Sequence, residues 1–252
     1  MRWVTETNRA LTFGHVADEY DRWRPSYPAA AVDWLAPAAP ARVADVGAGT
    51  GKLTSLLVAR GLVVEAVEPD KRMLAVLARN NPTARRHHSV STAVPVEDAS
   101  LDAVLVADAW HWFDDDETIA ELRRVLRPGG WLGLVWHVAA EPVEPWELDL
   151  MGESGRYDRS TKGSVQGLRN RLGYFRDEEL DFAQFPWVCE TTPEHLAALM
   201  ATTSMAIAMD EDERAGYLTE DRSKLQAACD AAGRASMPLR FEASCVRWTP
   251  RS

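Results

Sequence analysis

The sequence predicts an α/β protein built on a doubly wound, Rossmann-like sheet. Three features favour this class. Short apolar runs alternate with helical patterns from about Val43 to Trp136, as in the βαβ units of a parallel sheet. These runs are nearly continuous in apolar residues, which is typical of strands buried on both faces. One of them leads into a glycine-rich turn, Gly47 to Gly51, that opens a helix.

The sequence clearly indicates four strands in this region. They are Arg42 to Val46, Val63 to Val67, Leu101 to Ala107 and Trp131 to Trp136. The spacing requires one more strand near Arg85 to Val90, although its apolar pattern is weak.

Helices are expected between these strands. Lys52 to Arg60 follows the glycine turn and stops at a glycine, and Lys71 to Asn80 stops before a proline. Asp116 to Leu126 opens with acidic residues, which suit the positive end of the helix dipole.

The flanking regions complete one predicted domain, residues 1–252. Residues 1–41 form an amphipathic helical lead-in or lid, residues 42–137 the ligand-binding core, and residues 138–252 a C-terminal half with further helices and the last strands. In that half we expect an edge strand from Phe182 to Cys189, because Pro186 interrupts it. A helix capped by Thr192, a long helix from Asp210 to Ala232 and a final strand from Leu239 to Trp248 follow.

Composition excludes several classes of protein. The formal net charge of −10 argues against a partner held through its phosphate backbone, so no nucleic acid is expected. No apolar stretch is long enough for a membrane span, and the first twenty residues have no apolar signal region. The three cysteines are widely spaced, so neither a disulfide framework nor a zinc site is indicated. We expect a cytoplasmic monomer or homodimer.

The glycine turn is the most informative segment. Its spacing fails the P-loop pattern, which would need glycine at Val46 and a hydroxyl residue at Leu53. It also fails the dinucleotide pattern, whose third glycine would fall at Lys52, and this makes a nicotinamide dehydrogenase improbable. The pattern that remains is G-x-G-x-G. By itself, this pattern could also be a tight turn that binds no ligand.

Two carboxylates flank this turn. Glu68 ends the next strand, where a carboxylate can accept the hydroxyls of an unphosphorylated ribose. Asp45 precedes the turn and would repel a pyrophosphate but attract an ammonium or sulfonium group. A cationic or zwitterionic nucleoside is therefore the expected ligand, and S-adenosylmethionine fits that description.

These residues resemble the class I S-adenosylmethionine-dependent methyltransferases, in particular the small-molecule branch that includes trans-aconitate and ubiquinone-type enzymes. The similarity continues in the lead-in, in Leu101 to Val104, in Ala109 to Asp114 and in Leu126 to Gly130. The resemblance implies a seven-stranded sheet whose last strand runs antiparallel.

The resemblance also implies roles for individual residues. The methionine part would be held by Asp45, Gly47 and Gly49, and the ribose by Glu68. Pro69 and Asp70 would lie at the edge of the adenine, and Ala48 would also bind the cofactor. Tyr20 and Arg24 would lie on the lead-in over the cofactor, with Arg24 placed to pair with its carboxylate.

Two positions depart from the family pattern. Val90 stands where an acid usually binds the adenine amino group, so Ser91 and backbone groups would hold the adenine instead. Asp108 lies at the cofactor where a neutral amide is common.

Catalysis would depend mainly on aligning the acceptor with the methyl group. His111 and His137 follow neighbouring strands, and each could act as a base or merely pack. The acids from Asp114 to Glu117 are explained by a helix start, so no metal is expected. The methionine-containing helices from Pro193 to Ala232 are expected to form part of an acceptor pocket.

The expected function is methyl transfer from S-adenosylmethionine to a small organic acceptor at oxygen, nitrogen or carbon. The alternative is a catalytically silent protein that binds the same cofactor as a sensor or partner subunit, for which Val90 and Asp108 are the only support in the sequence.

Overall fold

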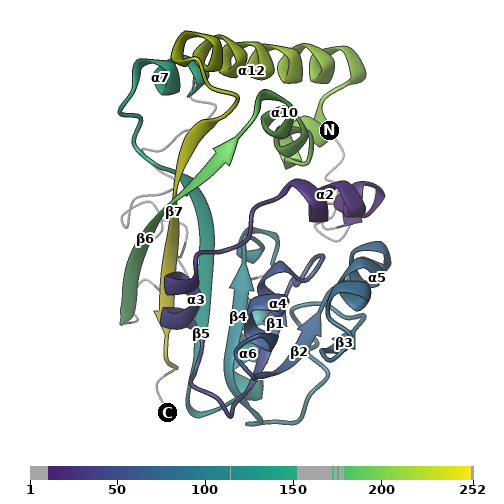
Figure 1. Cartoon of the computed structure of the whole chain (residues 1–252). Coiled ribbons are helices and arrows are strands. Elements are labelled where there is room, and N and C mark those ends of the chain that lie inside the picture. The colour runs from purple at the N-terminus through teal and green to yellow at the C-terminus, as the bar shows by residue number, and fades with distance from the viewer. Residues whose placement is uncertain (1–10, 114, 152–171, 173–174, 176–178, 251–252) are drawn as a thin grey trace.

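A seven-stranded mixed sheet forms the centre of the molecule (Figure 1). The computed structural model describes residues 11–113, 115–151, 172, 175 and 179–250. The strand order is β3-β2-β1-β4-β5-β7-β6. The strands are β1 (Arg42–Val46), β2 (Val63–Val67), β3 (Arg85–His87), β4 (Leu101–Ala107), β5 (Leu126–Ala139), β6 (Leu180–Thr191) and β7 (Met237–Trp248).

The direction of the strands confirms the predicted fold class. The pairs from β3 to β5 are parallel, whereas β7 runs antiparallel to both β5 and β6. The last strand of the chain is therefore the antiparallel one. The strand containing Pro186 is an edge strand as predicted, because β6 pairs only with β7 in the sheet.

Helices surround the sheet. In chain order they are η1 (Leu11–Val16), α2 (Ala17–Trp23), α3 (Ala29–Leu35), α4 (Lys52–Val58), α5 (Lys71–Asn80), η2 (Trp110–Trp112), α6 (Asp115–Val125), α7 (Pro145–Met151), α10 (Pro193–Ala201), α11 (Ser204–Ala208) and α12 (Glu211–Ala232). No helix in the described part of the chain combines the length and the apolar character that a membrane crossing requires.

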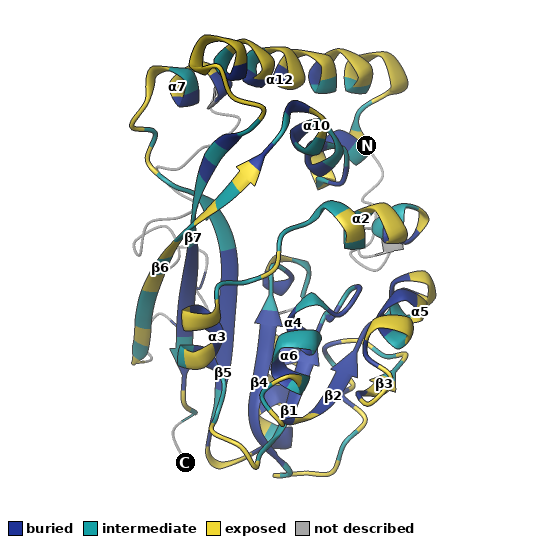
Figure 2. Cartoon of the chain, viewed as in Figure 1, coloured by how far each residue is buried: buried dark blue, intermediate teal, exposed yellow. Residues whose placement is uncertain are grey.

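The core lies on both faces of the sheet, and β4 shows why its sequence is continuously apolar. Val104 and Val106 pack in a cluster with residues of α6, whereas Ala103 and Leu105 pack in a second cluster with residues of α3 and α4. Successive side chains of a strand point to opposite faces, so both sets must be apolar. The central strands β1, β2 and β4 are accordingly buried along most of their length (Figure 2).

The structure corrects several predicted boundaries. The strand expected from Trp131 begins at Leu126, which pairs with Leu101 across a register shift, so α6 ends one residue earlier than expected. The same strand continues to Ala139 because β7 pairs with it as far as Phe241. The weak third strand covers only Arg85–His87, and α4 stops at Val58 rather than Arg60.

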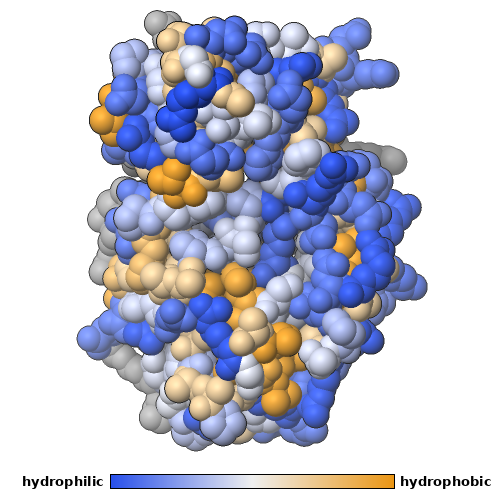
Figure 3. All heavy atoms as spheres, viewed as in Figure 1, coloured by the Kyte–Doolittle hydropathy of each residue, from blue (hydrophilic) through white to orange (hydrophobic). Residues whose placement is uncertain are grey.

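The helices α7, α10 and α12 form a cap beyond the carboxyl ends of the parallel strands (Figure 1). Buried residues of α12 recur every four positions, at Tyr217, Asp221, Leu225 and Cys229, so one side of this helix faces inward. Hydrophilic residues predominate on the face of the cap seen in Figure 3. Between this cap and α5 lies α2, which contacts both α10 and α5.

Candidate active site

The glycine turn joins β1 to α4, and all three of its glycines have left-handed backbone conformations. The φ angles of Gly47, Gly49 and Gly51 are +71°, +55° and +88°. A side chain at Gly47 would place its Cβ 2.7 Å from Cβ of Ala109, so this position also needs the small residue for packing. At Gly49, by contrast, no atom lies within 4 Å of a Cβ position. The middle of the turn therefore opens onto free space.

Asp45 lies beneath this turn at the end of β1. Its Oδ2 accepts a hydrogen bond of 2.6 Å from the Thr54 hydroxyl. Its Oδ1 is buried and has no hydrogen-bond partner among the described residues. Burial raises the pKa of this carboxyl to about 6. An unpaired buried carboxylate oxygen is costly, and a cationic ligand group beside it would lower that cost.

Glu68 reaches the same turn from the end of β2. Its Oε2 accepts a 2.8 Å hydrogen bond from the backbone N–H of Gly49, and its Oε1 accepts one of 2.8 Å from the N–H of Asp70. Burial raises the pKa of Glu68 to about 7, and these two backbone donors only partly oppose that effect. The two predicted acids thus flank the turn from neighbouring strands.

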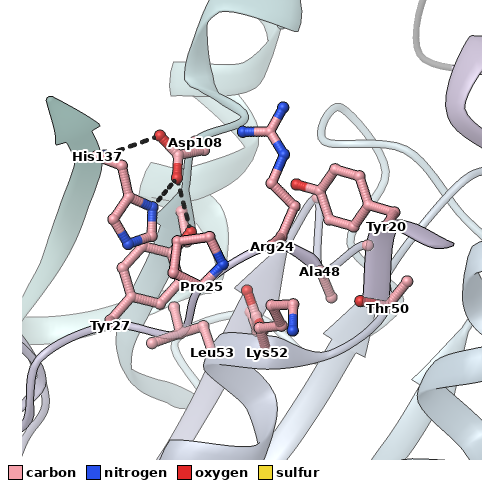
Figure 4. Close-up of a pocket in the computed structure, with 14 residues that line it drawn as sticks. Tyr20, Arg24, Pro25, Tyr27, Ala48, Thr50, Lys52, Leu53, Asp108 and His137 are labelled. Carbon is pink, nitrogen blue, oxygen red and sulfur yellow. Dashed lines mark hydrogen bonds and ion pairs between the residues drawn. The ribbon is translucent and has the colours of Figure 1, made fainter. Parts of the chain in front are cut away.

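Two cavities that share lining residues, of about 420 and 40 Å³, surround the turn, and we call them together the turn cavity. Figure 4 shows the residues that line the smaller one. The structure brings nearly all the predicted site residues to its walls. They are Tyr20, Arg24, Asp45, Gly47, Ala48, Gly49, Glu68, Pro69, Asp108, His111 and His137.

Ser91 is the exception, because it does not line the turn cavity. The side chain is buried, and its hydroxyl lies 2.8 Å from Oγ1 of Thr118 in α6. Its neighbour Val90 is 40% exposed. Met73 and Phe13, which line the cavity beside Pro69, were not predicted as site residues.

Asp108, directly after β4, and His137, near the end of β5, form a hydrogen-bonded pair (Figure 4). Oδ2 of Asp108 lies 2.8 Å from Nδ1 of His137 and accepts a 2.9 Å hydrogen bond from the Tyr27 hydroxyl. Its Oδ1 accepts one of 3.0 Å from the backbone N–H of His137. Burial raises the pKa of Asp108, but the charge interaction with His137 and these hydrogen bonds outweigh burial, so the pKa lies below its ordinary value. The carboxyl is therefore ionised, so Nδ1 of His137 carries a proton.

The second nitrogen of His137 is left for other contacts. Nε2 lies 3.3 Å from the carbonyl oxygen of Ser26, and the ring stacks on Tyr27 with centroids 4.3 Å apart. The sequence placed Tyr27 on the lead-in but did not link it to Asp108 or His137. Asp108 and His137 come together because β4 and β5 are adjacent and parallel. A prediction of this strand order would have placed the two residues side by side.

A further cavity of about 200 Å³ lies beneath the cap, and we call it the cap cavity. Most of its walls are apolar and come from α7, α10 and β7. Its lining residues are Arg24, Pro25, His137, Ala139, Glu147, Leu150, Leu196, Leu199, Met200, Thr203, Leu239, Arg240 and Phe241. Arg24, Pro25, His137 and Thr203 also line the turn cavity, so the two cavities adjoin at these residues.

Arg24 lies at this junction, where its side chain is held by Thr202, the residue that follows α10 of the cap. Its Nε and Nη2 donate 3.0 Å hydrogen bonds to the hydroxyl and the carbonyl oxygen of Thr202. Among the ion pairs of the described residues, none involves Arg24, so its charge is not neutralised by a neighbouring acid there.

Comparisons with known proteins agree with this geometry. A family model described as a methyltransferase domain matches residues 44–134. An uncharacterized methyltransferase of Mycobacterium tuberculosis is 40% identical over 240 residues, which cover 95% of this chain and 96% of the relative. A solved structure from Anaeromyxobacter dehalogenans, described as a type II methyltransferase, is 26% identical with a TM-score of 0.67, covering 89% of this chain and 96% of that one.

A fourth comparison concerns the fold alone. Phosphoethanolamine N-methyltransferase 2 of Haemonchus contortus, solved with phosphomonomethylethanolamine and S-adenosylhomocysteine, has 16% identity and a TM-score of 0.52. The match covers 94% of this chain and 58% of that one.

The fold, the glycine turn and the two flanking acids define a class I S-adenosylmethionine-dependent methyltransferase. The chain belongs to this family, and S-adenosylmethionine is its cofactor. The relatives give no support to the catalytically silent alternative. Membership of the trans-aconitate or ubiquinone-type branch stays a prediction.

The residues present fit this cofactor. The open space at Gly49 gives the ligand close access to the backbone, and the unpartnered Oδ1 of Asp45 suits a positively charged group. No group of three or more potential metal ligands occurs among the residues that the structure describes.

Proposed function

We propose that the protein moves the methyl group of S-adenosylmethionine to a small organic acceptor bound in the cap cavity. One observation carries this proposal: the turn cavity and the cap cavity share Arg24, Pro25, His137 and Thr203. Ligands in open α/β sheets bind beyond the carboxyl ends of the strands, where these residues lie. A cofactor in the first cavity and an acceptor in the second would meet at this junction.

On this proposal, the predicted cofactor residues act at the turn. Asp45 and the backbone around Gly49 hold the methionine part, Glu68 the ribose, and Arg24 the carboxylate. When bound, the cofactor would supply a methyl group activated by the sulfonium, and because its leaving group would be a neutral thioether, the protein needs no acid there. The main contribution of the protein is alignment, which is worth roughly 7 to 11 kcal/mol at best.

His137 is the proposed base for an acceptor that must lose its proton. Asp108 holds the proton on Nδ1, which leaves Nε2 to take a proton at the junction. Once protonated, Nε2 finds an acceptor in the Ser26 carbonyl 3.3 Å away, and Asp108 stabilises the positive ring from the other side. Asp108 thus acts through His137, as a positioning residue.

His111 is the second predicted base, and we assign it a smaller part. It is exposed on η2 and lines the turn cavity without lining the cap cavity. A base at that position would lie away from the proposed acceptor. His111→Ala therefore serves as the matched control for His137→Ala.

The experiment that tests the proposal uses S-adenosylmethionine labelled with isotope in the methyl group. The purified protein is incubated with fractionated metabolite extracts, and both labelled products and S-adenosylhomocysteine are measured. We expect label in a small molecule, and a loss of roughly 10²-fold to 10⁴-fold in rate for His137→Ala but not for His111→Ala. Cofactor binding without any transfer would instead favour the silent alternative.

A further inference from the structure

The far end of the cap cavity carries a polar pair that the proposed methyl transfer does not use. Arg240 of β7 and Glu147 of α7 both line the cavity and form an ion pair. Most of the other lining residues are apolar, with Leu150, Leu199 and Phe241 among them. The cavity lining therefore combines an apolar majority with this ion pair and with the polar groups of Arg24 and His137.

We propose that the acceptor is an amphipathic molecule whose apolar body fills the cap cavity and whose anionic oxygen group binds Arg240. This inference rests on the proposed function, because it takes the cap cavity as the acceptor site. A carboxylate and a phosphate share the required chemistry, since both present oxygen acceptors and negative charge to a guanidinium group.

Arg240 has hydrogen-bonding capacity to spare. Its Nη2 donates to Oε2 of Glu147, but its Nε is buried and has no partner among the described residues. A buried N–H without an acceptor is destabilising, and an oxygen atom of a ligand would remove that cost. The guanidinium can bind such an oxygen without giving up Glu147, because it has five N–H donors.

Glu147 acts as the support of Arg240 rather than as a ligand for a cation. Its Oε2 accepts 2.8 and 2.9 Å hydrogen bonds from the backbone N–H groups of Val143 and Glu144, in addition to the bond from Arg240. Burial raises the pKa of Glu147, but these donors outweigh it and hold the pKa below its ordinary value. The carboxylate is thus ionised, and its Oε2 already accepts from three donors.

The unpartnered donor of Arg240, and not an excess of positive charge, favours an anion. Arg240 is paired with Glu147, and the ionised Asp108 lies against His137. On the proposed function, Arg24 pairs with the cofactor carboxylate. A protonated amine has no acceptor to offer the Nε–H group of Arg240, which is a basis for selecting against amines.

The strand register indicates how long the acceptor is. The backbone N–H of Ala140 donates a 3.0 Å hydrogen bond to the carbonyl oxygen of Arg240, so Arg240 lies beside a residue three positions beyond His137. At about 3.3 Å per strand residue, the backbone positions of His137 and Arg240 are offset by roughly 10 Å along the strands. We therefore expect the reacting atom and the anionic group to be separated by an apolar body of about this length.

The test uses four octyl compounds that differ only in the head group: octanoate, octyl phosphate, octanol and octylamine. Their binding is measured by calorimetry with S-adenosylhomocysteine present. We expect octanoate and octyl phosphate to bind about ten-fold or more tightly than octanol, and octylamine to bind most weakly. In Arg240→Met the advantage of the two anions over octanol should disappear while octanol binding is unchanged.

Arg222→Met is the matched control, because Arg222 forms a comparable ion pair with Glu194 on the exposed surface. It should leave the anion preference intact. Equal binding of octanoate and octanol to the wild type would overturn the inference, as would an unchanged preference in Arg240→Met.

A second variant covers the case in which Arg240→Met does not fold. Leu199→Trp fills the cap cavity and should abolish binding of all four octyl compounds, while S-adenosylhomocysteine still binds. Persistent octanoate binding in this variant would overturn the inference. The proposed function is judged separately, by methyl transfer and by binding of S-adenosylhomocysteine.

Discussion

At the scale of single residues, Asp108 joins parts of the chain that are far apart in sequence. It contacts Tyr27 of the lead-in and His137 at the end of β5. Its φ angle of +50° is in the left-handed region, which aspartate tolerates better than most residues but which still costs about 1 kcal/mol. Two hydrogen bonds from His137 and one from Tyr27 offset this strain. The residue predicted to hold the cofactor is thus placed to orient a histidine.

Replacing Asp108 by Asn tests this role. An amide at this position can donate to Nδ1, which favours the ring tautomer with its proton on Nε2 and so disables the proposed base. We expect kcat to fall by roughly 10²-fold or more and its pH profile to change, while the dissociation constant of S-adenosylmethionine changes little. Asp98→Asn, at a surface ion pair with Arg124, is the control. A loss confined to cofactor affinity would return Asp108 to the cofactor site.

Gly49 offers a second test at the residue scale. Gly49→Asp adds a carboxylate in the open space of the turn, next to Glu68, and we expect cofactor affinity to fall by about ten-fold or more. Gly233→Asp is the matched control, because Gly233 is also left-handed, at φ +63°, with nothing within 4 Å of its Cβ position. Both variants should lose a similar amount of thermal stability, but only Gly49→Asp should lose binding in calorimetry. Equal cofactor affinity in the two would reject the site.

At the scale of elements, α2 owes its position to its neighbours. Seven residues are too few for a helix that is stable alone. Nζ of Lys52 donates a 2.6 Å hydrogen bond to the carbonyl oxygen of Asp21, and Asn80 of α5 donates one of 2.8 Å to the carboxylate of Asp21. On the cap side, Nε2 of His195 lies 3.2 Å from the carbonyl oxygen of Trp23. The lid over the turn cavity is therefore attached to both the core and the cap.

Lys52→Met should loosen this attachment. A hydrogen bond from a charged group is worth about 1.5 kcal/mol or more, so we expect S-adenosylhomocysteine to dissociate roughly ten-fold faster. Amide exchange in residues 17–23 should also quicken, because the helix loses a support. Lys224→Met, at an ion pair within α12, is the control and should change neither rate. Unchanged exchange in 17–23 would show that Lys52 does not hold the lid.

At the scale of the whole molecule, the parallel sheet collects acidic groups at one buried edge. Asp45 and Glu68 end neighbouring strands, and burial raises the pKa of each, to about 6 and about 7. The fold therefore carries unfavourable negative charge where the cofactor brings positive charge. Binding and protonation should compete at this edge.

The dependence on pH follows from the direction of these shifts. Because the folded-state pKa of Glu68 lies above its ordinary value of 4.5, the stability linked to this group is present below about pH 4.5 and is lost as the pH rises to about 7. The free energy of unfolding of the wild type, minus that of Glu68→Gln, should fall over this window in urea titrations without cofactor. A difference that stays constant with pH would contradict the raised pKa.

Cofactor affinity should change in the opposite direction. A cationic ligand favours the ionised carboxyls, so S-adenosylmethionine should bind more tightly as the pH rises from about 5 to 8, with release of protons. Calorimetry in buffers of different ionisation enthalpy measures that release. Glu68→Gln should reduce the number of protons released, and an identical release in wild type and variant would contradict the prediction.

The sequence by itself determined the fold class, the glycine turn, its two flanking acids and most strand positions. These features are local: the apolar period of a strand, the positive φ of a glycine and the spacing to the next strand end are all written in short segments. The start of β5 at Leu126 could not be predicted from a short segment, because it depends on pairing with Leu101. The burial of Ser91 against Thr118 likewise depends on how α6 packs.

Only the tertiary structure decided that Asp108 holds His137, that Tyr27 joins them and that the turn cavity and the cap cavity share lining residues. Each of these is a contact between segments separated by tens of residues, and it exists because β4 lies next to β5 and the lead-in crosses their carboxyl ends. The pattern of one segment carries no information about which other segment lies beside it in the sheet. The cofactor could therefore be inferred from a short motif, whereas the chemistry at the acceptor required the assembled sheet and cap.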